Sequence, residues 1–267
     1  MFLLMGGGYE QLMRKLSKQD TRRLSRWSEE NDANVELSEQ DGVRSLHLGS
    51  DLIQSAMRIS RPNDLEIVYT QCMMGFLLFE PNPKDVLMIG LGGGSLVKFV
   101  YHQFFETSIT AVEINPKVVT AAQNYFFLPP EDDRFKVVLA DGAEYVAQNP
   151  DSCDVLMIDG YEDGAMPRAL GSRTFYEYAA CALRRRGVMV VNFLGRDRLL
   201  NVYIDRIKEC SPGGVLRMDD GDHGNVIVFG FQKAPDKRRM KALAKRAKEL
   251  EDLYGLPFPL YVKELGF

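Results

Sequence analysis

Four short segments of the sequence place glycines or carboxylates directly after apolar runs. They are the string GLGGGS at 90–95, Glu113, Asp141 with Gly142, and Asp159. A glycine-rich turn between a strand and a helix exposes backbone N–H groups and lets a ligand approach the main chain closely. Glu113 follows at the spacing where a carboxylate accepts hydrogen bonds from the two hydroxyls of a ribose. These segments predict a nucleoside site, which would serve NAD and S-adenosyl ligands alike.

The two aspartates suit different parts of such a ligand. Asp141 could accept a hydrogen bond from an adenine amino group, with Gly142 letting the ring lie flat, or it could cap a short helix at 143–148. Asp159 would face the reacting end. Glu162 and Asp163 follow it, and clustered carboxylates attract a cationic substrate and can accept its proton. A solvated acidic loop is the alternative for these last two residues.

A parallel sheet would bring these segments together, and the chain from 85 onward has the required alternation. Strands are expected at 85–89, 108–114, 135–139, 154–158 and 187–193, with a closing strand pair at 215–218 and 225–231. Helices are expected at 63–79, 95–105, from 116, at 172–185 and at 199–210. This pattern predicts an α/β fold with a doubly wound, mostly parallel Rossmann-like sheet. Ligands bind beyond the carboxyl ends of such strands.

The segments on either side of this alternation have other patterns. Residues 1–33 read as a basic helical extension, and 34–62 as a small antiparallel β-hairpin module with a turn signal at Asp41-Gly42. The Rossmann-like domain is then expected at 63–235. Residues 236–267 form a C-terminal helical tail, in which 237–253 has the pattern of a charged amphipathic surface helix.

Composition narrows the classes of partner. The 267 residues carry 33 Lys and Arg against 37 Asp and Glu, a formal charge of −4, so we expect no nucleic-acid partner. The four cysteines form no CxxC pair and the three histidines are dispersed, so neither a disulfide framework nor a metal site is expected. Apolar runs are too short to span a bilayer, and the N-terminus does not resemble a signal peptide. We expect a cytoplasmic protein with no membrane partner.

The motifs taken in order resemble those of the spermidine synthase family. The runs are LHLGSDLIQSA, VLMIGLGGGSL, AVEIN, LADGAEYV and DVLMIDGYEDGAMP, and the likeness covers roughly residues 35–232. Members of this family are polyamine aminopropyltransferases with the fold of class I S-adenosylmethionine-dependent methyltransferases. The resemblance implies decarboxylated S-adenosylmethionine as co-substrate, a small-molecule amine as acceptor, and a homodimer or homotetramer.

The resemblance also implies a role for each site residue. On the nucleoside side, Gln54 would contact the ligand's tail, Gly90, Gly92 and Gly94 would line its sulfonium, Glu113 would hold the ribose, and Asp141 with Gly142 would hold the adenine. Asp159 would be the general base, and the amine side would comprise Tyr69, Tyr161, Glu162 and Asp163. The amine side departs from the family pattern, because Gly93 stands where the family turn GGGDGG has an amine-binding Asp, and DGYED replaces DSSDP.

Three other functions compete with aminopropyl transfer. A methyltransferase would use intact S-adenosylmethionine and must satisfy the carboxylate of that donor, for which Lys98 is the nearest lysine. A non-catalytic nucleoside-binding protein would explain the loss of the amine-binding Asp. An NAD-dependent dehydrogenase would explain the glycines and Glu113 but offers no use for Asp141-Gly142.

Overall fold

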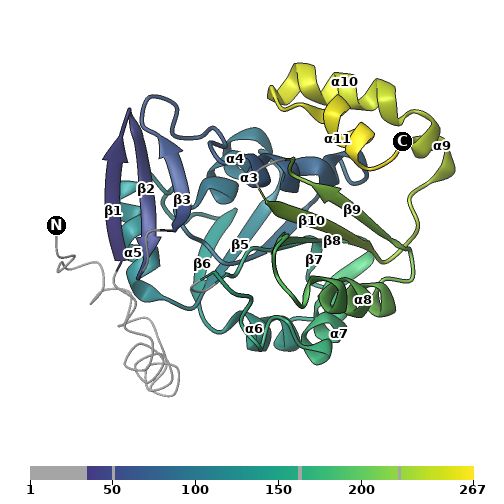
Figure 1. The fold of residues 1–267 in the computed structure, drawn as a ribbon, viewed down its shortest axis with the longest axis horizontal. Coiled ribbons are helices and arrows are strands. Elements are labelled where there is room, and N and C mark those ends of the chain that lie inside the picture. Colours follow the sequence, from purple (N-terminus) through teal and green to yellow (C-terminus); the bar gives the residue numbers. More distant parts are fainter. Residues whose placement is uncertain (1–34, 50–51, 162–163, 222–223) are drawn as a thin grey trace.

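The computed structural model describes residues 35–49, 52–161, 164–221 and 224–267. The helical extension expected at 1–33 lies outside the described residues. The described chain forms two sheets, a large one with helices on both faces and a small one at one end (Figure 1).

The large sheet has seven strands in the order β6-β5-β4-β7-β8-β10-β9. They are β4 (Asp85–Ile89), β5 (Ser108–Glu113), β6 (Phe135–Leu139), β7 (Cys153–Ile158), β8 (Leu183–Leu194), β9 (Val215–Asp219) and β10 (Asn225–Phe231). All pairs from β6 to β8 are parallel, whereas β10 runs antiparallel to both of its neighbours. The predicted doubly wound, mostly parallel sheet is confirmed. Its strand order reverses between β4 and β7, the switch point at which such sheets bind ligands.

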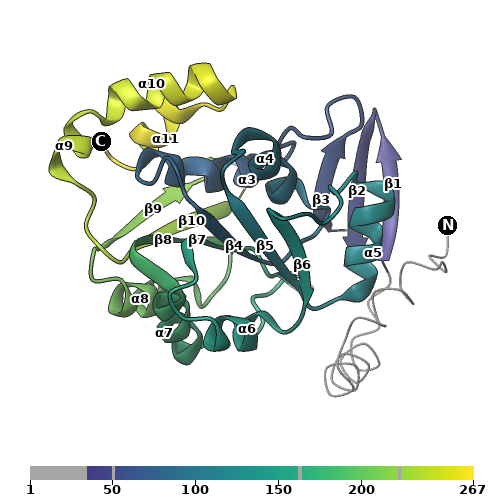
Figure 2. The same cartoon turned by 180° about the vertical axis from the view of Figure 1, so that it is seen from behind.

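Helices cover both faces of this sheet because their apolar sides pack on the Val-, Leu- and Ile-rich strands (Figures 1 and 2). They are α3 (Val68–Met73), η1 (Met74–Leu78), α4 (Ser95–Gln103), α5 (Pro116–Tyr125), α6 (Gly142–Gln148), α7 (Arg173–Ala182) and α8 (Leu200–Cys210). Local capping explains where several begin. Pro116 occupies the first turn of α5, where its missing N–H costs nothing, and the Asn115 side chain accepts from Lys117 N.

Two helix boundaries expected from the sequence are wrong. The helix expected at 63–79 begins only at Val68, because the preceding residues form turns closed by the bonds Arg61 N to Arg58 O and Asp64 N to Arg61 O. The helix expected at 172–185 ends at Ala182. Leu183 instead enters β8, where it pairs with Cys153 of β7, so strand pairing overrides the helical periodicity.

The small sheet contains the antiparallel strands β1 (Val35–Gln40), β2 (Val43–Leu48) and β3 (Ile53–Arg58). Its first hairpin turns at Asp41 and Gly42, both with positive φ, as a two-residue hairpin turn requires. The predicted antiparallel module is therefore present, with a third strand beyond the expected hairpin. Its buried Leu46 and Met57 share a core with Phe126, which follows α5, so the small sheet is fixed against the main domain.

The C-terminal segment forms three helices, α9 (Lys237–Lys241), α10 (Leu243–Tyr254) and α11 (Phe258–Glu264). The single helix expected at 237–253 is wrong in its continuity, because the helix is interrupted at Ala242. Its amphipathic pattern is present in α10, where Leu243, Ala247 and Leu250 are buried in the main core and most other side chains are exposed. Arg246 strengthens this attachment, because its Nε and Nη2 both donate to Leu77 O of η1. Along the described ranges, no helix is long and apolar enough to cross a membrane.

Candidate active site

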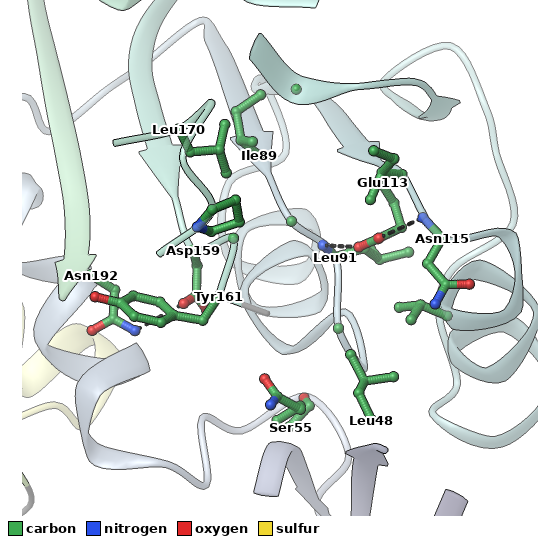
Figure 3. Close-up of a pocket in the computed structure, with 18 of the residues that line it drawn as sticks. Leu48, Ser55, Ile89, Leu91, Glu113, Asn115, Asp159, Tyr161, Leu170 and Asn192 are labelled. Carbon is green, nitrogen blue, oxygen red and sulfur yellow. Dashed lines mark hydrogen bonds between the residues drawn. The ribbon is translucent and has the colours of Figure 1, made fainter. Parts of the chain in front are cut away.

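A cavity of about 490 Å³ opens at the switch point, beyond the carboxyl ends of β4, β5, β7 and β8 (Figure 3). This volume is in the range of small-molecule sites. The small sheet supplies one wall through Leu48, Ile53 and Ser55. The cavity brings together the sequence-predicted residues Gln54, Tyr69, Gly90, Gly92, Glu113, Asp141, Gly142, Asp159 and Tyr161. Glu162 and Asp163 lie outside the described residues.

Gly90 allows the ends of β4 and β7 to approach each other. Its φ is 95°, and a Cβ at this position would lie 2.1 Å from the carbonyl oxygen of Asp159. Asp159 N donates to Ile89 O at 2.9 Å, and Gly90 N donates to Val112 O at 2.9 Å. The backbone that carries Asp159 is therefore seated directly on the glycine turn, with no room for a side chain between them.

The other glycines of the turn have separate roles. Gly92 lines the cavity with a φ of 52°. Gly94 is instead the N-cap residue of α4, and a Cβ there would lie 2.5 Å from Leu128 Cδ1, so its α-carbon faces the protein interior. A Cβ at Gly93 would lie 2.8 Å from both Phe126 Cδ1 and Ser55 Oγ. The direction in which a side chain at position 93 would project is thus already filled.

The Glu113 carboxylate is oriented by backbone amides at the end of β5. Its Oε2 accepts from Leu91 N and its Oε1 accepts from Asn115 N, each at 2.9 Å (Figure 3). Burial raises the pKa of Glu113, while these backbone hydrogen bonds act in the opposite direction. A carboxylate oxygen has two lone pairs, so each oxygen keeps acceptor capacity for a second donor. This geometry suits a vicinal diol.

Asp141 caps α6, as one of the two sequence interpretations proposed. Its Oδ1 accepts from Ala143 N at 2.7 Å and from Glu144 N at 3.3 Å. Gly142 is required by packing, because a Cβ there would lie 2.4 Å from Ile89 Cγ2 on β4. Both residues also line the cavity, so capping leaves room for the adenine role as well.

Asp159 lies across the cavity from Glu113 (Figure 3). Each of its carboxylate oxygens has a side-chain partner. Tyr69 Oη donates to Oδ2 at 3.0 Å, and Asn192 Nδ2 donates to Oδ1 at 2.9 Å. The Asn192 amide is itself held by Asn225, whose Nδ2 donates to Asn192 Oδ1 at 2.9 Å. Burial raises the pKa of Asp159 above its ordinary value, and the two hydrogen bonds partly oppose this.

Asn192 and Asn225 are functional candidates that the sequence reading missed. The available signal was a polar residue inside an apolar strand, since Asn192 interrupts the run GVMVVNFL and is nonetheless buried. A buried amide in such a position needs hydrogen-bond partners, which Asp159 and Asn225 supply. Neither partner can be identified from spacing along the chain.

Tyr161 and Lys98 are occupied by structural contacts. Tyr161 Oη accepts from Leu194 N at 2.7 Å, which fixes the end of β8 beside the cavity. Lys98 is fully buried, and its Nζ donates to Phe126 O at 2.7 Å, just beyond the C-terminal end of α5. Burial lowers the pKa of Lys98 to about 8. Lys98 therefore points into the protein instead of offering a cation to a donor carboxylate. Among the described residues, no cluster of His, Cys, Asp and Glu is arranged to hold a metal ion.

A family model and a curated relative show the family of this chain. A family model described as the spermine/spermidine synthase domain matches residues 66–202. A polyamine aminopropyltransferase of Chromobacterium violaceum is 41% identical over 231 residues, which cover 86% of this chain and 88% of that protein. This match thus spans most of both chains.

Two solved structures have the same fold. A spermidine synthase in complex with the transition state analogue AdoDATO gives a TM-score of 0.56 at 24% identity, covering 87% of this chain and 88% of that one. Human methyltransferase-like protein 13 in complex with SAH gives a TM-score of 0.61 at 26% identity, covering 68% and 91%. The fold is therefore that of the class I methyltransferases.

Proposed function

The chain belongs to the spermine/spermidine synthase family and is a transferase, and we propose that it moves an aminopropyl group from decarboxylated S-adenosylmethionine to an amine. One observation carries the proposal. Glu113, oriented for a ribose diol, and Asp159, oriented by Tyr69 and Asn192, face the same cavity from opposite sides of the glycine turn. Residues 89–91 connect the two carboxylate positions, because Ile89 O accepts from Asp159 N and Leu91 N donates to the Glu113 carboxylate.

The proposed donor would lie along the sheet edge. Its ribose would bind Glu113, its adenine would lie against Asp141 and Gly142, and its sulfonium would face Gly90 and Gly92 with Gln54 near the tail. The acceptor nitrogen then attacks the carbon bonded to sulfur. A C–N bond forms as the C–S bond breaks, and the sulfur leaves as a neutral thioether. Fixing both reactants in this geometry supplies much of the rate enhancement.

The attacking amine needs a free lone pair, so its ammonium form must first lose a proton. We assign this proton to the Asp159 carboxylate. Burial makes Asp159 a stronger base than an exposed aspartate, because its pKa is raised. The Tyr69 hydroxyl stays protonated, since burial and the neighbouring Asp159 raise its pKa well above the ordinary value. It can therefore donate to Asp159 throughout. Tyr161, Glu162 and Asp163 complete the proposed amine side.

Methyl transfer from intact S-adenosylmethionine is the second candidate, and the glycine turn favours it. Gly93 faces Phe126 and Ser55, so this turn presents no carboxylate to the ammonium of a decarboxylated donor. The structural likeness to human methyltransferase-like protein 13 in complex with SAH points in the same direction. Against it, Lys98 is engaged with Phe126 O and does not serve the donor carboxylate.

Calorimetry with each donor, followed by product analysis, separates the two functions. We expect tighter binding of the decarboxylated donor and transfer of its aminopropyl group to an amine. Asp159→Asn should keep donor affinity and lose roughly 10²- to 10⁴-fold in kcat, whereas the exposed control Asp205→Asn should change neither. Tighter binding of the intact donor together with a methylated product would contradict aminopropyl transfer. An unchanged rate in Asp159→Asn would remove the assignment of the base.

We further propose a cytoplasmic homodimer or homotetramer that uses no nucleic-acid or membrane partner. The proposed division is 1–33, 34–62, 63–235 and 236–267, with association through the small sheet. That sheet supports the proposal because β1 is an edge strand within the described residues, and edge strands can pair with a second chain. Light scattering on the purified protein is expected to give twice or four times the chain mass, and a monomer would contradict it.

A further inference from the structure

The carboxylates that line the cavity within the described ranges already have partners. Glu113 accepts from Leu91 N and Asn115 N, and Asp141 caps α6. Asp159 accepts from Tyr69 and Asn192. Asp159 has the role of receiving the proton of the attacking nitrogen. The proposed function assigns Glu162 and Asp163, which lie outside the described residues, to the reacting amine. Beyond these, the described lining presents no further carboxylate to a second ammonium group on the acceptor.

Two arginines, Arg168 and Arg196, line the same cavity. Both are exposed, and across the part of the chain that the structure describes neither has a hydrogen-bond or ion-pair partner. An arginine at the edge of a cavity whose guanidinium is not engaged can reach a ligand with its five N–H donors. These two side chains are the cations of the described lining.

Both arginines come from the Asp159 side of the switch point. Arg168 lies in the segment after β7, two residues before Leu170. That leucine packs against Gly160, the residue after Asp159, since a Cβ on Gly160 would lie 2.6 Å from Leu170 Cδ1. Arg196 follows Leu194 at the carboxyl end of β8, the strand that carries Asn192. The ribose site on β5 lies on the other side of β4. Both cations therefore line the cavity on the side of Asp159, where we place the acceptor.

We propose that the acceptor carries a carboxylate as well as its reacting amine, and that Arg168 and Arg196 bind this carboxylate. The inference rests on the proposed function. A simple diamine has two ammonium groups at neutral pH, and one of them would face two guanidiniums. An amino acid with a terminal amine presents the opposite charge there, and arginine forms bidentate, charge-assisted hydrogen bonds with a carboxylate.

The same anion could in principle belong to intact S-adenosylmethionine, so the two sources must be separated. The carboxylate of that donor would lie beside the sulfonium, next to the glycine turn after β4. The arginines follow β7 and β8 instead. We therefore place the carboxylate on the acceptor.

The test uses three pairs of acceptors that differ only by a carboxylate: ornithine and putrescine, lysine and cadaverine, and 4-aminobutyrate and propylamine. We expect a higher kcat/KM for the carboxylate member of at least one pair with the wild-type enzyme. The double variant Arg168→Gln/Arg196→Gln should lower that value by roughly 10- to 100-fold and leave its partner unchanged. Arg185→Gln, on the exposed start of β8 away from the cavity, should change neither.

The remaining outcomes overturn the inference or the proposed function separately. A preference for the plain amine in every pair, or an equal loss for both members in the double variant, overturns the carboxylate site and leaves aminopropyl transfer intact. Weaker calorimetric binding of intact S-adenosylmethionine by the double variant would assign the arginines to the donor and also overturn it. Methylated product and no aminopropylated product with any acceptor would instead refute the proposed function.

Discussion

Replacing Gly90 by alanine should separate the stability of the fold from the geometry of the site. The new methyl group would lie 2.1 Å from Asp159 O and 2.9 Å from Asp159 C, both backbone atoms. The neighbouring strand ends are fixed by the bonds Asp159 N to Ile89 O and Gly90 N to Val112 O. The collision therefore cannot be relieved by rotating a side chain, and the backbone around Asp159 must move by about 1 Å to restore ordinary contact.

The matched control is Gly42→Ala in the first hairpin. Gly42 also has a positive φ, 74°, but a Cβ there meets nothing within 4 Å. The control thus measures the conformational cost alone, about 1–2 kcal/mol. Gly90→Ala should lower the free energy of unfolding by this conformational cost and by about 1–3 kcal/mol more, because the new methyl group overpacks the site. Urea unfolding of both variants measures the difference.

Activity gives the second readout of the same pair. A displacement of about 1 Å at the reacting group typically costs about 10²-fold in rate. We expect Gly90→Ala to lose this factor in kcat under conditions where it is still folded, and Gly42→Ala to keep the wild-type rate. If Gly90→Ala were as stable and as active as Gly42→Ala, the close seating of Asp159 on the glycine turn would not matter for catalysis.

Three further variants test the electrostatics of the site. Asp159→Asn should raise the unfolding free energy more at pH 7 than at pH 4. The pKa of Asp159 is raised in the folded protein, so ionisation of this group destabilises the fold as the pH rises through that pKa, and the variant lacks this destabilisation. An equal gain at both pH values would argue against burial as the cause of the raised pKa. Glu113→Gln should weaken binding of decarboxylated S-adenosylmethionine, measured by calorimetry, by roughly 10- to 100-fold. The new amide NH2 group would face the N–H group of Leu91 or Asn115, so two hydrogen-bond donors would oppose each other. Unchanged affinity would place the ribose elsewhere. Burial lowers the pKa of Lys98 to about 8, so between pH 8 and 10.5 the unfolded chain still binds the Lys98 proton and the folded protein does not. The wild type should therefore gain stability relative to Lys98→Met as the pH rises through this range. A stability difference that does not vary with pH would show that Lys98 is not desolvated.

The parts of the fold that the sequence predicts are those set by local patterns. Alternating apolar strands and helices fix the parallel sheet, and the glycine turn with Glu113 and Asp159 marks its carboxyl edge. The errors lie where distant contacts decide. Leu183 leaves the helix because β7 offers Cys153 as a pairing partner. The helix expected at 237–253 is interrupted at Ala242, and Arg246 of α10 donates to Leu77 O of η1, a contact between distant residues that no local pattern shows.

The site divides in the same way. Carboxylates at strand ends can be located from spacing, and the family resemblance drawn from these motifs is confirmed by the matches to spermidine synthases. Asn192 and Asn225 escape such reasoning because their relevance depends on a chain of contacts between β7, β8 and β10. Gly94 matches the glycine motif but serves packing against Leu128. The motif thus identifies the turn that lines the cavity, whereas tertiary contacts decide which of its residues face the cavity.

The most direct test of the central claim is a crystal structure with decarboxylated S-adenosylmethionine bound. The account predicts that both ribose hydroxyl oxygens lie within about 3 Å of the Glu113 carboxylate, with the sulfonium carbon turned toward Asp159. A donor bound with its ribose away from Glu113, or with the sulfonium carbon directed away from Asp159, would contradict it.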